Sequence, residues 1–216
     1  LAETLRTIAK EGRDGFYKGW VAEDIVTYLS GLGGCHALDD FAEMRAEYVT
    51  PISSEYRGYT MLQIPPNGQG ITALMMLNIL EDYDLASLDP NSVARLHLET
   101  EASRMAYAAR DRYVADQRQE DVPVDHMLSA EFAAELRAQI SPDRAVEAPE
   151  ATGPAYRDTI YLSVVDKDRN ACSFINSLYM PFGTGLTAPR SGVVLQNRAA
   201  GFRVEPGHPN NVAPRK

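Results

Sequence analysis

The chain has 216 residues, of which 44% are hydrophobic, so it can bury a core and is not expected to be disordered. Its formal net charge is −9, which disfavours nucleic acids and anionic membranes as partners, because both are bound through clustered Lys and Arg. No apolar run approaches the roughly 20 residues of a membrane span, and the N-terminus has no signal-peptide pattern. These features leave the cellular compartment open.

The first third of the chain is predicted to be mostly helical. Apolar residues at helical spacing predict helices over residues 1–11, 21–32 and 38–46. Two short strands are predicted within residues 52–64, on either side of the turn Arg57-Gly58. A loop, Pro65-Pro66-Asn67-Gly68-Gln69-Gly70, then leads into a very apolar helix over residues 71–81.

The middle of the chain contains one long predicted helix and a shorter one. Asp89-Pro90-Asn91-Ser92 is typical of a helix start, and the long helix is predicted over residues 93–116. Its charged residues, Glu99 and Glu101 among them, are expected to form a solvated face. A shorter helix is predicted over residues 129–140. The positions of the long helix expected to face inward are Leu96, Met105, Ala106, Ala109 and Tyr113.

Cysteine and histidine are sparse. Cys35 and Cys172 are too few for a disulfide framework, and we expect them to be small buried apolar residues. The four histidines show no metal-ligand spacing, so neither a metal nor another cofactor is expected. These histidines are His36, His97, His126 and His208.

The last third of the chain begins with a predicted linker and continues as a hairpin. Residues 141–158 contain several prolines and few apolar residues, which is typical of an exposed linker. A strand is predicted from Thr159 to Asp166, then a polar turn and a second apolar strand. If the peptide bond before Thr159 were cut, its hydroxyl would become a nucleophile and its freed α-amino group the base. By spacing alone, a β-branched residue that starts a strand is the simpler interpretation.

Several motifs in order carry a family resemblance. From Thr159 to Phe202 the sequence resembles the start of the small subunit of γ-glutamyltranspeptidases, which are N-terminal-nucleophile hydrolases. The upstream part resembles the end of the large subunit. Its matching motifs are Gly15-Phe16-Tyr17, Leu38-Asp39-Asp40-Phe41-Ala42, Tyr56-Arg57-Gly58-Tyr59 and the loop from Pro65 to Gly70.

The resemblance implies an α+β fold, part of a four-layer α-β-β-α sandwich. Residues 1–158 would be the C-terminal part of a large-subunit-like region, with the linker 141–158 at its end. Residues 159–216 would be the N-terminal part of a small-subunit-like region. The segments that follow in this family include substrate-site serines and a glycine pair that forms the oxyanion hole. The 216-residue chain alone is therefore expected to be inactive, with the remainder of its own small subunit as partner and a homo-oligomer possible.

The resemblance also assigns catalytic roles. Thr159 would attack the carbonyl of Asp158 to free itself, and would then accept the acyl group. Ser177 corresponds to the hydroxyl residue that hydrogen-bonds the nucleophile, although a solvent-facing strand serine is an equally simple interpretation. Phe182-Gly183-Thr184-Gly185 matches the family's Gly-rich turn.

The segment from Gln196 to Phe202 departs from the usual pattern of the family. Gly201 stands where transpeptidases have an aspartate for the substrate's α-ammonium group, and Arg198 stands at a Glu/Gln position. A guanidinium repels an ammonium group but binds a carboxylate through two parallel hydrogen bonds. Asn197 and Tyr179 are also expected to contact the substrate. These changes resemble the branch of transpeptidase-like amidohydrolases and acylases, although Arg198 could also be a surface arginine.

The expected function is hydrolysis or acyl transfer of a small amide that carries a carboxylate. Two alternatives stay open at this point. One is a true γ-glutamyltransferase that acts on glutathione and uses another acceptor for the α-ammonium group. The other is a non-catalytic fragment or domain.

Overall fold

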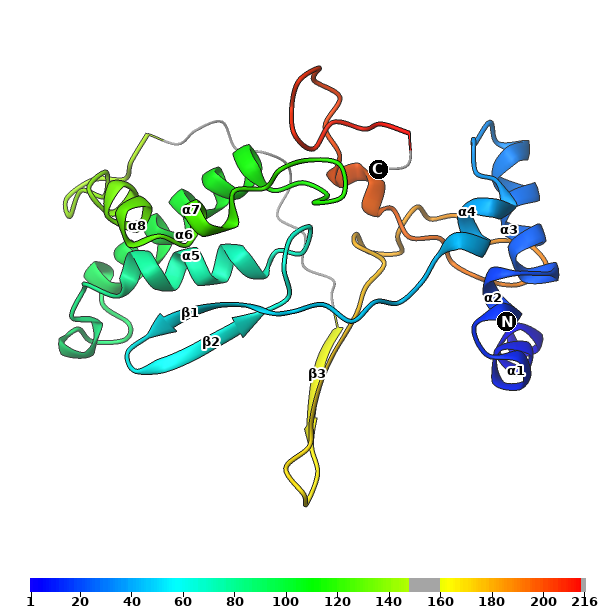
Figure 1. Ribbon diagram of the computed structural model, residues 1–216, viewed down its shortest axis with the longest axis horizontal. Helices are drawn as coiled ribbons and strands as arrows, with labels where there is room; N and C mark the ends of the chain where they lie inside the picture. The colour runs from blue at the N-terminus through cyan, green and yellow to red at the C-terminus, as the bar shows by residue number, and fades with distance from the viewer. Residues whose placement is uncertain (148–159, 215–216) are drawn as a thin grey trace. The chain divides into compact units, whose positions relative to one another are not determined.

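The computed structural model describes residues 1–147 and 160–214, and Figure 1 shows its elements. Asp158 and Thr159, the predicted cleavage site, lie outside the described residues. The chain forms two compact units. Unit 1 comprises Leu1–Glu47 and Pro154–Gly201, and unit 2 comprises Tyr48–Gly153 and Phe202–Lys216. The predicted division after residue 158 is defined by a cleavage site rather than by compactness, and it stays a prediction.

Unit 1 begins with four helices. They are α1 (Ala2–Glu11), α2 (Asp14–Tyr17), α3 (Trp20–Gly31) and α4 (Leu38–Glu43). Helix α2 was not predicted, because four residues are too few to show a helical period, and α4 is three residues shorter than predicted. The buried side chains of Val21 and Ile25 on α3 pack with Ala188, which lies far along the chain. The amphipathic α3 therefore provides the core against which the loops that follow the hairpin are held.

The strands of unit 1 form an antiparallel hairpin, neither face of which is covered by the residues that the structure describes. Strand β3 (Ile160–Val165) pairs with β4 (Ala171–Asn176), with Leu162 opposite Phe174 and Tyr161 opposite Ile175. Successive side chains point to opposite faces of a strand, so these two pairs lie on opposite faces. Every residue of both strands is exposed. The hairpin thus shows apolar side chains to solvent on both faces.

The prediction that the two cysteines are buried was wrong. Cys172 lies in β4, on the same face as Leu162, and is exposed because none of the described residues covers that face. Cys35 is exposed in the loop between α3 and α4.

Unit 2 is built around an apolar helix. Strands β1 (Ile52–Tyr56) and β2 (Tyr59–Gln63) form the predicted hairpin around Arg57-Gly58, and α5 (Gly70–Leu80) follows. Helix α5 is apolar all round, which is typical of a buried helix. It packs against α6 (Val93–Tyr113), α8 (Ala130–Arg137) and both strands. The remaining short helices of this unit are η1 (Leu85–Ser87) and α7 (Val124–Met127), neither of which was predicted.

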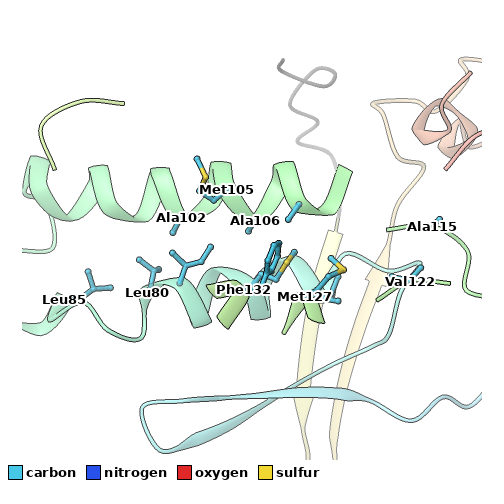
Figure 2. Packing of buried hydrophobic residues seen from close by; sticks show 13 residues of the cluster. Leu80, Leu85, Ala102, Met105, Ala106, Ala115, Val122, Met127 and Phe132 are labelled. Atoms are coloured by element: carbon cyan, nitrogen blue, oxygen red, sulfur yellow. The ribbon is translucent and has the colours of Figure 1, made fainter. Parts of the chain in front are cut away.

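The core of unit 2 lies between α5, α6 and α8. Figure 2 shows Ala102 and Ala106 of α6 on the side of that helix toward α5, with Phe132 of α8 near α5, and Met105 belongs to the same buried cluster. The predicted inward positions are thereby confirmed for Met105, Ala106 and Ala109, and Tyr113 is partly buried against the cluster. The prediction that Leu96 faces inward was wrong. Its side chain is 52% exposed, one turn from the start of the helix. Within the described residues, no helix is both long and apolar enough to cross a membrane.

A second prediction about α6 that was wrong concerns Glu101. It was predicted to lie on a solvated face, but it is 1% exposed. Arg104 on the same helix binds one of its oxygens, but its other partner, the backbone N–H of Val146, lies 45 positions later in the chain, where no helical pattern could indicate it. The predicted starts of α6 and α8 are confirmed. The hydroxyls of Ser92 and Ser129 accept hydrogen bonds from the N–H groups of Arg95 and Phe132, at the starts of α6 and α8.

Candidate functional site

The loops after the hairpin, residues 177–201, are held on the helices of unit 1. The buried hydroxyl of Thr4 on α1 donates to the carbonyl oxygen of Ser191 at 2.7 Å. The guanidinium of Arg190 stacks over the ring of Trp20, 4.5 Å from its centroid. Helices α1 and α3 thus fix the turn at residues 190–191 from two sides.

Asp24 on α3 attaches the same turn electrostatically. Its carboxylate accepts the backbone N–H of Ser191 at 2.7 Å and that of Arg190 at 3.2 Å. Burial raises the pKa of Asp24, but the hydrogen bonds from Ser191 and Arg190 outweigh burial, so the pKa lies below the ordinary aspartate value. Asp24 is therefore ionised at neutral pH, where its hydrogen bonds to the turn are strongest.

The turn Phe182-Gly183-Thr184-Gly185 is closed by backbone contacts. The N–H and the hydroxyl of Thr184 both donate to the carbonyl oxygen of Leu195 at 2.9 Å. Gly183 has φ of +57°, and a Cβ there would lie 2.2 Å from that same oxygen. Only glycine fits this position, which brings the two ends of the loop together.

Ser177 and Asn197 order the backbone around Tyr179. The hydroxyl of Ser177 accepts the N–H of Tyr179 at 2.9 Å, and the side-chain oxygen of Asn197 accepts the N–H of Met180 at 3.0 Å. Tyr179 itself has φ of +81°, a conformation that is rare for a residue with a side chain. Non-glycine residues with such backbone strain cluster at functional sites, where surrounding contacts hold them.

Arg198 lies over Tyr179. Its guanidinium is 5.4 Å from the centroid of the Tyr179 ring, and Nη2 donates to the carbonyl oxygen of Ser177 at 3.3 Å. The side chain is otherwise exposed. In the part of the chain that the structure describes, no carboxylate lies within ion-pair distance of Arg198. An exposed guanidinium without a carboxylate partner is able to bind an anionic group from solution.

Gly201 ends the short helix η2 (Arg198–Gly201) beside the same tyrosine. A Cβ at Gly201 would lie 3.5 Å from the Tyr179 hydroxyl, an ordinary van der Waals distance. The position therefore has room for a side chain, but it carries neither a charge nor a hydrogen-bond acceptor of its own beyond the backbone.

The structure thus brings together five of the predicted site residues: Ser177, Tyr179, Asn197, Arg198 and Gly201. Asp158 and Thr159 cannot be placed with them, because they lie outside the described residues. Sequence analysis missed Asp24, since its partners are 166 and 167 residues away and leave no local signal. Among the described residues, no three His, Cys, Asp or Glu side chains gather as they would around a metal ion.

The fold has been seen in solved structures. It is similar to the crystal structure of cephalosporin acylase from Bacillus halodurans, with a TM-score of 0.87 and 38% sequence identity over 99% of this chain and 38% of that one. The gamma-glutamyltranspeptidase family profile matches residues 1–216. The chain belongs to the gamma-glutamyltranspeptidase family.

Two curated relatives show the range of proteins that this chain resembles. It is 40% identical to a glutathione hydrolase-like YwrD proenzyme from Bacillus subtilis, over 100% of this chain and 41% of the relative. It is 35% identical to an oxamate amidohydrolase proenzyme from Klebsiella pneumoniae, over 100% of this chain and 40% of the relative. The chain therefore spans about two fifths of the length of these relatives.

Proposed function

We propose that the complete protein is a self-processing amidohydrolase or acyltransferase whose nucleophile is Thr159. Membership of the family supports this, as do the names of the two curated relatives, both of which are proenzymes. Cleavage between Asp158 and Thr159 would free an α-amino group beside the threonine hydroxyl. One residue would then supply both nucleophile and base.

The hairpin supports the proposed architecture. Strands that are buried on both faces read as continuous apolar runs, and β3 and β4 have apolar side chains on both faces. In the α-β-β-α sandwich they would be inner strands, covered by the remainder of the small subunit. Residues 1–158 would then form the C-terminal part of the large subunit, and residues 159–216 the N-terminal part of the small subunit.

The observation that carries the substrate proposal is the position of Arg198. Its guanidinium lies over Tyr179 with no carboxylate partner among the described residues, and the neighbouring Gly201 offers no negative charge. Such a site suits a small amide that carries a carboxylate and no amine. The name of the oxamate amidohydrolase relative fits this class, because oxamate has one amide and one carboxylate.

The proposed reaction has two steps. The hydroxyl of Thr159 attacks the amide carbon, its proton passes through the α-amino group to the departing amine, and an ester forms on Thr159. Water, deprotonated by the same amino group, then attacks the ester and releases the acid. Ser177 would hydrogen-bond the nucleophile, while Arg198, Asn197 and Tyr179 would hold the substrate's carboxylate end. The donors of the oxyanion hole are proposed to lie in the rest of the small subunit.

Mass analysis of the full-length protein tests this proposal. We expect a new N-terminus at Thr159 in the unaltered protein and an intact precursor in Thr159→Ala. Thr159→Ser, which keeps a hydroxyl, should still be cleaved and serves as the matched control. Normal processing of Thr159→Ala would show that another residue is the nucleophile.

A further inference from the structure

A buried carboxylate lies in the middle of α6 in unit 2. Glu101 is 1% exposed, and burying a charge is costly unless it is paired and hydrogen-bonded. One of its oxygens binds the guanidinium of Arg104, one turn further along α6. The other accepts the backbone N–H of Val146 at 2.8 Å. One of the groups that compensate this charge thus lies in a segment 45 residues away.

Two more residues of α6 bind the same segment. Nη2 of Arg104 donates to the carbonyl oxygen of Val146, so both backbone polar groups of Val146 are bound. Nε2 of His97 lies 2.7 Å from the carbonyl oxygen of Ser141, and since a carbonyl only accepts, the histidine donates. His97, Glu101 and Arg104 follow one another at helical spacing and occupy one face of α6. We call these three residues the α6 clamp.

The clamp is closed at neutral pH. Burial raises the pKa of Glu101, but the hydrogen bonds from Val146 and Arg104 outweigh burial, and the pKa lies below the ordinary glutamate value. The side chain of Val146 also packs against the core of unit 2. Residues 141–146, predicted to be the start of an exposed linker, are therefore attached by polar and apolar contacts together.

We propose that the α6 clamp is a positioning device for self-cleavage, an inference that rests on the proposed role of Thr159. With the clamp closed, the chain is fixed at Val146, and only residues 147–158 separate this fixed point from Thr159. With the clamp open, the last point that these contacts hold lies before residue 141, further from Thr159 along the chain. If loop-closure entropy governs this separation, the longer separation disfavours placement of the scissile bond roughly twofold. Loss of the direction in which the chain leaves the clamp at Val146 would add to this effect.

The first test compares two variants of the full-length protein. Glu101→Gln removes the negative charge of the clamp. Glu99→Gln removes another carboxylate of the same helix, one that pairs with Arg95 at 2.8 Å. After cell-free synthesis, the half-time for precursor conversion should lengthen about two- to tenfold in Glu101→Gln. It should not change in Glu99→Gln. The kcat/KM of the cleaved enzyme should be the same in both variants, since the clamp acts before cleavage.

Three results would overturn the proposal. They are an unchanged half-time in Glu101→Gln, an equal slowing in Glu99→Gln, and a parallel loss of kcat/KM, which would indicate a general structural role. If Glu101→Gln fails to fold, His97→Ala takes its place, because it removes one contact without leaving a buried charge unpaired. It should slow conversion by a smaller factor, and an unchanged rate would count against the clamp.

A second measurement separates this proposal from the function on which it rests. In the uncleavable Thr159→Ala precursor, the amide hydrogen of Val146 should exchange slowly with solvent, and at least about tenfold faster once Glu101→Gln is added. Fast exchange in the Thr159→Ala precursor itself would show that the clamp does not form. Absence of cleavage at Thr159 in the unaltered protein would instead refute the proposed function, and with it the clamp's role in processing.

Discussion

At the scale of single residues, the proposed choice of substrate depends on Arg198 and Gly201. A γ-glutamyl donor carries an α-carboxylate and an α-ammonium group side by side, so a site that selects it needs charges of both signs. Arg198 can bind the carboxylate, whereas Gly201 leaves the ammonium group without a partner. Leaving such a group unpaired costs on the order of 1–3 kcal/mol, or roughly tenfold to a hundredfold in affinity.

We therefore predict that Gly201→Asp raises kcat/KM on glutathione about tenfold or more relative to that on oxamate. There is space for the new side chain, because a Cβ would lie 3.5 Å from the Tyr179 hydroxyl. Gly201→Asn, of the same size but uncharged, is the control and should not change the ratio. Both values are measured on the full-length processed enzyme. Efficient glutathione hydrolysis by the unaltered enzyme would mean that another residue binds the ammonium group, as in a true γ-glutamyltransferase.

A second prediction at this scale concerns Gly183. Gly183→Ala should lower the melting temperature and the kcat/KM of the full-length enzyme, because its Cβ would meet the Leu195 carbonyl oxygen at 2.2 Å. Gly185→Ala is the matched control. It has a similar positive φ of +71° but nothing within 4 Å of a Cβ. The control should lose only the roughly 1–2 kcal/mol expected for an alanine in this conformation. Equal losses in the two variants would show that the close approach to Leu195 has no importance.

At the scale of elements, α3 and the turn at residues 190–191 depend on each other through Asp24. The lowered pKa of Asp24 means that its contribution to stability is present at neutral pH and is lost as the pH falls through that lowered pKa. Asp24→Asn should thus destabilise the protein at pH 7, and the difference from the unaltered protein should shrink as the pH falls below about 4. Thermal unfolding across this range measures the difference.

Glu23→Gln provides the control for Asp24, since Glu23 is an exposed acid next to it on the same helix. It should change stability by less than about 0.5 kcal/mol at either pH. A loss in Asp24→Asn that is independent of pH would contradict the assignment of the effect to the carboxylate's charge.

The elements also show which features a sequence pattern can reveal. Helical spacing of apolar residues predicted α1 and α3, a very apolar run predicted α5, and a helix-start signal predicted α6, so each of these elements leaves a local pattern in the sequence. The same periodicity failed for Glu101, because a buried carboxylate looks like a solvated one until its partner at Val146 is known. It also failed for α2 and α7, each a single turn long.

The candidate site likewise contains residues that a sequence pattern indicates and residues that only the fold reveals. Motifs proposed Tyr179, Asn197, Arg198 and Gly201 as substrate contacts, and the structure brings these four residues close together, while their role stays a prediction. Asp24 accepts hydrogen bonds from the backbone of a turn that is distant in sequence, so only the fold reveals it. The placement of Thr159 relative to these residues stays a prediction, since Thr159 lies outside the described residues.

At the scale of the whole molecule, we predict that residues 1–216 produced alone show little or no hydrolysis of γ-glutamyl-p-nitroanilide. The chain spans about two fifths of its curated relatives, and the oxyanion donors are proposed to lie in the rest of the small subunit. Each such donor is typically worth about 10²–10³ in rate. The measurement compares this chain with the full-length protein under the same conditions. Equal turnover by the two would place the donors within residues 1–216.

The hairpin β3–β4 has a further consequence, for the synthesis of the protein. Its outer strand edges and apolar faces make it a template on which another copy could add strands, the step that begins β-aggregation. In a chain made from its N-terminus, the hairpin would emerge before any later segment that covers it. The turn between the strands carries Asp166, Lys167, Asp168 and Arg169, and charges that flank an apolar strand oppose such self-association. The charged turn would thus oppose aggregation of the hairpin until a later segment covers its strands.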